Sequence, residues 1–501
     1  MRARSIPVYL GVPLQTAPRA EWVLRTLLAV CGAAPVPVYE PERAAECVLA
    51  YAPQPVAGVP TIPVSEAALD LLTSGDALPP DSFDRFETPA GPLEGVFPVD
   101  GEGFAAPFDL IAAAFLLLAC WDEHTSPERD QHGRLPFTAS VFARNDALDY
   151  RAPAVDGYLR LVRILVNEGL EAADRGALQR LDWAAPYTRD GDEGGGAAAF
   201  AVALTHDVDG LKRWTARGWL AAAKRTVGAA RTGNWEKAHF ELGGVGYALT
   251  RDIPRGRDPF WTFPELLAQE DERGVSSTFF LLASHGHPTD GSQPAVYRKR
   301  LPRLVALLRD ADREIGLHGN DRDRIEEGGL AEDRAALAEK AQVEIAGMRY
   351  HYLRCLYHET LPLLDTQGFA YDTSLAFAER EGFRCGFSFP FHPYDLRRER
   401  PLDLVELPLA IMDSSLQEKK YRGLDAPQAR EAAQAVLATL RESGGAAALL
   451  WHHNRFHAHV GRGYGDVYWQ LLDWIKEQGG VALPAGELVR RYRERAGETT
   501  L

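Results

Sequence analysis

The segment ALTHDVDG, residues 203–210, combines residue types that could carry out hydrolytic chemistry. An apolar run ends in Asp207 and Asp209, and a glycine follows directly. Side chains alternate along a strand, so the two acids should point the same way. Because two carboxylates so close together repel, a cation bound between them would explain the pair economically. A solvated acidic turn after a buried strand is the alternative that this segment alone leaves open.

Length and composition indicate a globular chain of two domains. The 501 residues exceed one ordinary core, and 46% are hydrophobic and 25% charged. The net charge of −15 argues against a nucleic-acid partner, since no basic surplus is available to neutralise phosphates. The five cysteines have no paired spacing, so we expect buried free thiols and neither disulfides nor a zinc knuckle.

Residues 1–30 carry no recognisable targeting segment. Pro7, Pro13 and Arg19 interrupt the apolar runs, which are too short for a signal sequence or a membrane span. A strand followed by an amphipathic helix is expected there instead. We therefore expect a cytoplasmic protein without a transmembrane segment.

Residues 186–199 form the clearest boundary in the chain. Their sequence, PYTRDGDEGGGAAA, is rich in glycine and aspartate, which resist regular structure. We therefore expect a smaller amino-terminal α/β accessory domain over residues 1–190 and a catalytic domain over residues 196–501. Within the first, residues 108–124 are apolar over most of their length, which predicts a core helix.

The second domain alternates strand-like apolar runs with amphipathic helices. The runs begin near residues 200, 276, 314, 347, 369, 404 and 446. This rhythm predicts an α/β fold in which about seven parallel strands with helical crossovers form a distorted (β/α) barrel. Functional residues of such barrels gather at the carboxyl ends of the strands. A long excursion over residues 211–260 is expected to be a helical lid or packing insertion.

Five segments of this domain, taken in order, resemble the polysaccharide deacetylases with the NodB homology domain, also called carbohydrate esterase family four. THDVDG at residues 205–210 resembles the family motif TFDDG with one residue inserted between the acids. EIGLHGNDRD at 314–323 supplies one histidine of the usual HxxxH pair but has Arg322 in place of the second. The remaining segments are GMRYHYLR at 347–354, YDTSL at 371–375 and LLWHHN at 449–454.

The resemblance covers residues 198–490 and is nearest to a bacterial branch of the family with an extra amino-terminal domain. That domain carries a phrase like WDEHTSPERDQHGRLP, residues 121–136 here. We expect this phrase to be structural, as a polar turn or a contact with the barrel.

The resemblance implies a role for each matching residue. Asp207 would be the general base and His452 the general acid, while Arg349 would orient the base and keep it ionised. Asp209 and His318 would bind a divalent metal, for which zinc is the usual expectation. Residues expected to line the substrate pocket are His351, Tyr371, Asp372 and Trp451.

The third protein ligand is open, because Arg322 stands where the family has its second histidine. His206 is one candidate, although strand alternation should turn it away from the acids. His351 is another, and the further choices are Asn320, Asp321 or a water molecule.

The resemblance predicts a metal-dependent hydrolase that removes acetyl groups from N-acetylated sugars or glycans. Two alternatives stay open: a hydrolase of small non-sugar amides, and a catalytically inactive barrel that binds carbohydrate. Retention of both acids, Arg349 and His452 argues against the inactive barrel.

Overall fold

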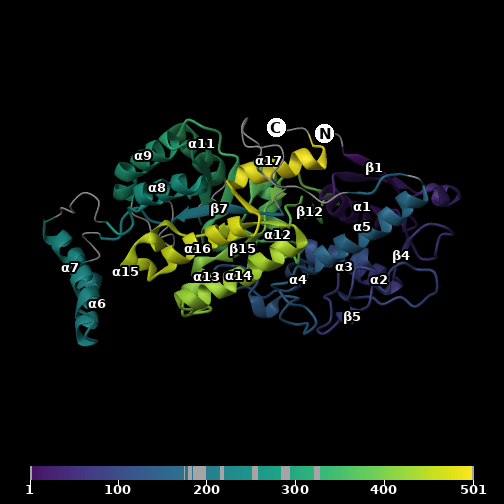
Figure 1. Ribbon diagram of the computed structural model, residues 1–501, viewed down its shortest axis with the longest axis horizontal. Helices are drawn as coiled ribbons and strands as arrows, with labels where there is room; N and C mark the ends of the chain where they lie inside the picture. The colour runs from purple at the N-terminus through teal and green to yellow at the C-terminus, as the bar shows by residue number, and fades with distance from the viewer. Residues whose placement is uncertain are drawn as a thin grey trace.

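The computed structural model describes residues 3–173, 175–178, 183, 199–214, 219–250, 258–283, 294–320 and 328–498. Figure 1 shows an amino-terminal α/β region at one end and a larger α/β region around a curved sheet beside it. Helices α6 (Trp219–Arg231) and α7 (Trp235–Thr250) pack on each other and project at the opposite end. These two helices confirm that the predicted excursion after the first barrel strand is largely helical, although its described residues 211–214 and 258–260 are not.

The amino-terminal region is built on a parallel sheet with the order β2-β1-β3-β4. The strands are β1 (Arg4–Leu10), β2 (Ala33–Val38), β3 (Leu49–Ala52) and β4 (Thr61–Pro63). The predicted core helix is present as α3 (Leu110–Leu118), and all of its residues are buried. It ends before Cys120, whose φ of 45° is left-handed, and a separate helix α4 (Trp121–Thr125) follows. Further elements of this region are α1 (Ala17–Ala29), α2 (Glu66–Ser74), β5 (Asp84–Phe86), β6 (Leu93–Gly95) and α5 (Ala154–Ala172).

The larger region contains the predicted barrel of parallel strands. They pair in the order β14-β11-β10-β9-β8-β7-β16-β15, and β17 also pairs with β7. The strands are β7 (Phe200–Val208), β8 (Thr278–Leu281), β9 (Glu314–Gly319), β10 (Gly347–Tyr350), β11 (Tyr371–Asp372), β14 (Val405–Glu406), β15 (Leu409–Met412), β16 (Ala446–Leu450) and β17 (Gly480–Leu483).

The chain itself closes the barrel, because β14 and β15 are separated only by residues 407–408. On one side, the backbone N–H of Leu407 donates to the carbonyl of Asp372 at 2.9 Å. On the other, Ala448 donates to the carbonyl of Pro408 at 2.7 Å. Together, β14 and β15 form one irregular stave, that is, one interrupted strand of the barrel wall. This stave pairs with β11 on one side and β16 on the other, so the barrel is closed by seven strand positions.

Helices connect the barrel strands and cover the outside of the barrel. They are α8 (Phe263–Arg273), α9 (Pro294–Asp310), α11 (Gly329–Ala341), α12 (Tyr357–Thr366), α13 (Asp413–Gln417), α14 (Ala426–Ser443), α15 (Ala458–Gly461), α16 (Tyr464–Glu477) and α17 (Ala485–Ala496). Local sequence sets the bounds of α14: a capping box between Asp425 and Gln428 begins it, and Gly444 with a φ of 74° ends it. A short antiparallel pair, β12 (Tyr394–Asp395) and β13 (Arg400–Pro401), lies outside the barrel sheet.

The two regions are packed together through one contiguous hydrophobic cluster. Trp22 of α1 lies against Tyr394, with ring centroids 5.0 Å apart. The sulfur atoms of Cys120 and Cys385, one from each region, lie 3.3 Å apart, and all five cysteines are buried with free thiols. The carboxyl-terminal helix α17 reaches back to the first residues of the chain (Figure 1). The domain boundary predicted between residues 190 and 196 lies outside the described residues and stays a prediction.

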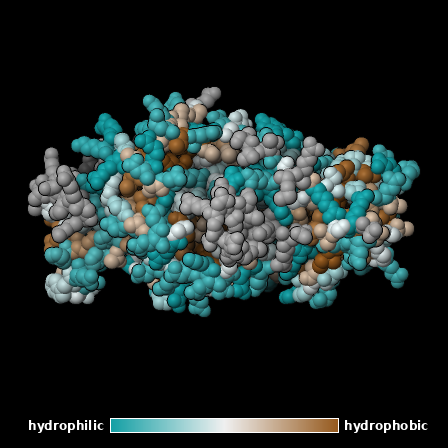
Figure 2. Space-filling model, turned by 45° about the horizontal axis from the view of Figure 1, so that its top comes forward, coloured by the Kyte–Doolittle hydropathy of each residue, from teal (hydrophilic) through white to brown (hydrophobic). Residues whose placement is uncertain are grey.

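Hydrophilic residues predominate on the face in Figure 2, and hydrophobic ones appear there only in small, scattered groups. Within the described residues, none of the helices has the length and apolar character needed to cross a membrane.

Candidate active site

Asp207 and Asp209 lie at the carboxyl end of β7 and face the same side, as strand alternation predicts. Asp207 is buried, whereas the side chain of Asp209, just past the strand, is 36% exposed. Both carboxylates approach His318, whose Nε2 lies 3.2 Å from Asp209 Oδ1 and 3.9 Å from Asp207 Oδ2. The two acids therefore share one space at the carboxyl end of the barrel strands.

His318 lies in β9, and its ring is oriented by the neighbouring strand. Its Nδ1 lies 2.9 Å from the backbone oxygen of Arg349, an atom that can only accept a hydrogen bond. Nδ1 therefore carries a proton, and Nε2 is the atom directed at the carboxylates. A backbone carbonyl that holds one imidazole nitrogen in this way is the usual support of a metal-binding histidine.

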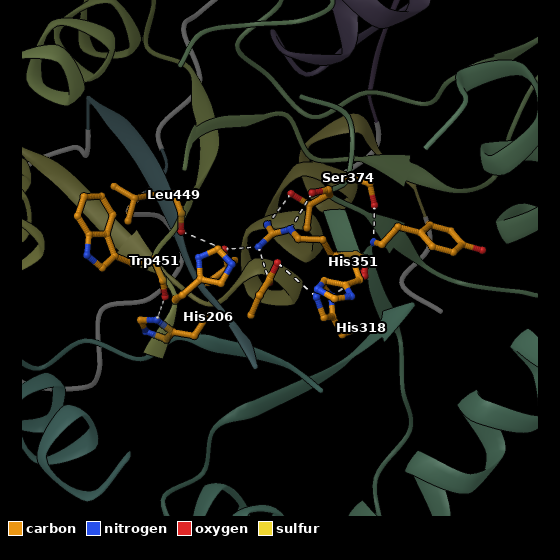
Figure 3. A network of polar contacts seen from close by, with 12 residues as sticks. His206, His318, His351, Ser374, Leu449 and Trp451 are labelled. Atoms are coloured by element: carbon orange, nitrogen blue, oxygen red, sulfur yellow. Dashed lines mark hydrogen bonds and ion pairs between the residues drawn. The ribbon is translucent and has the colours of Figure 1, made fainter. Parts of the chain in front are cut away.

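His351 directly follows β10 and completes a group of three candidate metal ligands. Its Nε2 lies 3.7 Å from Asp209 Oδ1, and its ring centroid is 5.1 Å from that of His318. Ligand atoms of Asp209, His318 and His351 all lie within 4.8 Å of one another. Figure 3 shows the two imidazoles side by side. The structure thus favours His351 as the third metal ligand, which the sequence leaves open. The sequence had also suggested that His351 lines the substrate pocket.

His452 follows β16 and approaches the same space from the opposite side. Its Nε2 lies 3.5 Å from Asp209 Oδ2. Its Nδ1 lies 2.5 Å from Oδ1 of Asp413, a buried residue that begins α13. The second oxygen of Asp413 accepts a hydrogen bond from Arg455 Nε at 2.9 Å. The ring of His452 is therefore held with one nitrogen on Asp413 and the other directed into the site.

Arg349 lies in β10 and is fully buried beneath the two acids. Its Nη1 donates to Asp207 Oδ1 at 3.0 Å and to Thr205 Oγ1 at 2.8 Å. Its Nε and Nη2 donate to the backbone oxygen and hydroxyl of Thr373 at 2.9 and 3.0 Å. All three of its nitrogens thus have partners, and the only carboxylate among these partners is Asp207.

The charges in this site oppose the effect of burial on each pKa. Burial favours the neutral form of Asp209, but His452, His351 and His318 hold its pKa well below the usual range. Burial lowers the pKa of His452, and the carboxylates of Asp413 and Asp209 reverse this and raise it to about 9. For His318, Asp207 and Asp209 likewise outweigh burial and raise the pKa. A cation at this place, either a proton or a metal ion, is therefore stabilised by the surrounding carboxylates.

The donor set fits a divalent ion of the zinc type. It consists of two imidazoles and one carboxylate, and the ring of His318 already has its remaining nitrogen satisfied by a backbone carbonyl. Three protein ligands leave room for water or substrate in a catalytic zinc site. A proton on Nε2 of His318 would compete with the ion for the same lone pair, so binding should release protons.

His206 does not join this group, in contrast to its expected place among the metal ligands. Its Nδ1 lies 2.6 Å from the backbone oxygen of Trp451, and its Nε2 lies 3.1 Å from Oε1 of the buried Glu270. Figure 3 shows His206 beside Trp451 and apart from His318. Alternation along β7 turns its side chain to the face opposite Asp207, so both ring nitrogens serve the packing behind the strand.

Three residues expected to line the substrate pocket are also directed elsewhere. The hydroxyl of Tyr371 donates to Glu314 at 2.8 Å, and Glu314 begins β9 at the amino end of the barrel. Asp372 accepts hydrogen bonds from the backbone and hydroxyl of Ser374. Trp451 Nε1 donates to the backbone oxygen of Tyr464 at 2.9 Å. All three residues are fully buried, and the structure shows their polar atoms in these contacts and not in the group around Asp209 and His318.

Asn320 and Asp321 are the two remaining side-chain candidates for the third ligand. Asn320 is buried, and its Nδ2 donates to Asp333 of α11 at 2.8 Å. Asp321 lies outside the described residues, as does Arg322.

Two parts of the site were missed in the sequence. Asp413 follows the last strand of the irregular stave, so the rule that acids after a strand serve the site could have found it. The second part is Tyr352, whose ring stacks on His351 at 3.8 Å between centroids and also on His132 at 4.7 Å. His132 belongs to the amino-terminal phrase at residues 121–136, for which a contact with the barrel was one of the two expected roles, and this stack is such a contact.

Comparison with known proteins finds a family model over the amino-terminal region only. A family of unknown function, DUF7033, matches residues 10–169. None of the curated proteins matches the chain.

Several solved structures are similar to part of the chain at low identity. A polysaccharide deacetylase candidate from Mycobacterium smegmatis is 21% identical, with 61% of this chain and 94% of that chain covered and a TM-score of 0.38. Puue allantoinase is 14% identical, with coverages of 62% and 99% and a TM-score of 0.40. A CE4 family pseudoenzyme from Bacillus anthracis is 12% identical, with coverages of 58% and 66% and a TM-score of 0.29.

Proposed function

We propose that this protein is a metal-dependent hydrolase that removes acetyl groups from N-acetylated sugars or glycans. The observation that carries the proposal is the convergence of Asp209, His318 and His351 into one candidate metal group, with Asp207 and His452 directed into the same space. A divalent ion, with zinc as the first choice, would be held by these three residues. When bound, it supplies a water of lowered pKa and polarises the acetyl carbonyl.

Asp207 is suited to be the general base. Arg349 donates to its Oδ1 at 3.0 Å and holds the carboxylate in a fixed orientation. The other oxygen, Oδ2, is the one near His318. Arg349 thus leaves Asp207 one oxygen free to take the proton of the attacking water.

His452 is suited to protonate the departing amine. Asp413 holds Nδ1 and stabilises the charged imidazolium, while Nε2 is directed toward Asp209 and the shared space. An amide nitrogen leaves only when it is protonated, so a histidine already held in its charged form has the proton available. Arg455 on the second oxygen of Asp413 keeps that carboxylate in place.

A substrate panel tests the proposal directly. Acetylated monosaccharides, acetylated chito-oligosaccharides and small cyclic amides would be incubated with the full chain, with and without zinc or cobalt, and acetate or amide hydrolysis would be measured. Metal-stimulated release of acetate from a sugar supports the proposal. Turnover of cyclic amides alone would favour a small-molecule amidohydrolase, and metal binding without any turnover would favour an inactive carbohydrate-binding barrel.

A further inference from the structure

A basic pocket lies beside the candidate active site, between the projecting helices and the loops at the carboxyl end of the barrel. It is open to solvent and has a volume of about 500 Å³. Its lining contains seven arginine and lysine side chains but only two glutamates. The basic residues are Arg213, Arg225, Lys237, Lys419, Lys420, Arg455 and Arg462. In a chain with a net charge of −15, a pocket of this composition is unusual.

The cations of the pocket exceed the acids that neutralise them. The buried Glu241 pairs with both Arg213 and Arg225, at 2.8 and 2.9 Å, so one positive charge of this trio is not balanced. Lys420 pairs with Glu418 at 3.3 Å. Arg455 pairs with Asp413 at 2.9 Å. Seven basic side chains against these three acids leave an excess of four positive charges around the pocket. Such an excess in a concave site attracts anions and raises their local concentration.

The paired arginines are also held in place before any ligand arrives. Glu241 comes from α7 and is almost fully buried, and it fixes the guanidinium groups of Arg213 and Arg225 from behind. Planar guanidinium groups bind phosphate and carboxylate oxygens in pairs. Because their orientation is already set, little side-chain freedom would be lost when an anion binds.

Arg455 connects this pocket to the candidate catalytic residues. It lines the pocket and donates to Asp413, whose other oxygen holds His452. A ligand bound by Arg455 would therefore be connected to His452, the group proposed to protonate the leaving amine, through two side chains, Arg455 and Asp413.

We propose that this pocket binds an anionic group, phosphate or carboxylate, of the saccharide substrate while the acetamide lies at the candidate metal group, within reach of His452. The inference rests on the proposed hydrolase function, whose substrate it narrows to acidic or phosphorylated saccharides. The volume of about 500 Å³ accommodates a diphosphate or one acidic sugar unit. The protein would then recognise two parts of its substrate: the anionic group in the basic pocket and the acetyl group at the candidate metal site.

Equilibrium binding tests the pocket without relying on catalysis. The full chain would be titrated calorimetrically with inorganic pyrophosphate and, separately, with a trigalacturonate, so that the two arms distinguish phosphate from carboxylate. The Lys237→Gln/Arg462→Gln double variant removes two charges of the pocket, and Lys476→Gln on the exposed end of α16 is the matched control. We expect the Kd for at least one anion to rise tenfold or more in the double variant and to stay unchanged in the control.

Two results would contradict the proposed anion binding by this pocket. In the first, neither anion binds the wild-type chain; in the second, the double variant binds as tightly as the wild type. If the double variant does not fold by circular dichroism, each single variant carries the same test with a smaller expected loss. Catalysis gives a second readout, because the ratio of kcat/KM for an acidic saccharide to that for a neutral one should fall about tenfold in the double variant. Anion binding without any deacetylation would uphold the pocket and reject the proposed function.

Discussion

His132 of the amino-terminal region stacks on Tyr352 of the barrel, with ring centroids 4.7 Å apart and planes inclined by 15°. Tyr352 stacks in turn on His351, a candidate metal ligand, at 3.8 Å. Tyr352 has a φ of 59°, which is left-handed, and Arg134 of the same amino-terminal phrase donates to its backbone oxygen at 2.5 Å. The amino-terminal region thus holds the residue that fixes the ring plane of His351.

This stack predicts that a change outside the barrel weakens metal binding. His132→Ala should raise the Kd for cobalt or zinc, because Tyr352 and then His351 lose their support. Loss of a group that orients a ligand typically costs about 10- to 100-fold in metal affinity, and an indirect contact should lie at the low end of that range. The measurement is titration against a chromophoric chelator. Glu128→Ala, at an exposed position of the same phrase, should leave the Kd unchanged, and an equal loss in both variants would contradict the stack.

The two acids should differ in what they contribute. Asp209→Ala should abolish metal binding and turnover, whereas Asp207→Asn should abolish turnover with the metal still bound. Metal content and acetate release would be measured on the same samples, together with thermal unfolding. Equal metal loss in the two variants would show that the roles of base and ligand are divided wrongly.

The pair of Asp413 and His452 should act mainly on the chemical step. Asp413→Asn removes the charge that favours the imidazolium and should lower kcat for an acetamide by about 10²-fold, with a smaller change in KM. An activated aryl acetate needs no protonation of its leaving group, so its hydrolysis should be less affected. If both substrates lose rate equally, His452 serves the metal or the oxyanion and is not the acid.

Asp156 lies at the contact between the two regions, and its raised pKa should make the free energy of unfolding depend on pH. This α5 residue accepts a hydrogen bond from the backbone of Ser388 at 3.0 Å, and burial raises its pKa to about 7. An acid whose folded pKa is raised contributes stability below its unfolded pKa of about 3.9, and that contribution is lost as the pH rises through about 7.

The free energy of unfolding should therefore fall from pH 4 to pH 8 by up to about 4 kcal/mol through this group, since one pKa unit corresponds to about 1.4 kcal/mol. Asp156→Asn keeps the shape and an acceptor for Ser388 but cannot ionise, so its unfolding should depend less on pH. Denaturant titrations of both chains at pH 4, 6 and 8 measure the difference. Parallel pH profiles would mean that another group governs this range.

The periodicity of the sequence predicted the barrel because each strand is a short apolar run with a recognisable break after it. Alternation along the strand placed Asp207 and Asp209 on one face, and the structure agrees. The same alternation counted against His206 as a metal ligand, yet His206 was kept among the expected ligands, and the structure directs it to Trp451 and Glu270 instead. The residues of the YDTSL and LLWHHN segments were harder to assign. Tyr371, Asp372 and Trp451 neighbour functional positions in sequence, yet all three are packed and not exposed to the site.

Other features depended on contacts that no local pattern encodes. The stack of His132 on Tyr352 joins positions more than two hundred residues apart, and neither residue stands in a periodic run. The irregular stave was predicted as one strand, whereas its hydrogen bonds pass from one neighbour to the other at Pro408. Asp413 was not singled out in the sequence, although it directly follows β15 and the rule for acids after a strand applies to it.

The single hydrophobic cluster that spans both regions has a consequence for how this chain can change over time. A module with its own core can be gained, lost or exchanged between proteins, because the surface it leaves behind is already polar. Here, separation near residue 190 would uncover apolar faces on both pieces and release Tyr352 from His132. The two halves should therefore be inherited together, with substitutions on one side of the contact matched by substitutions on the other.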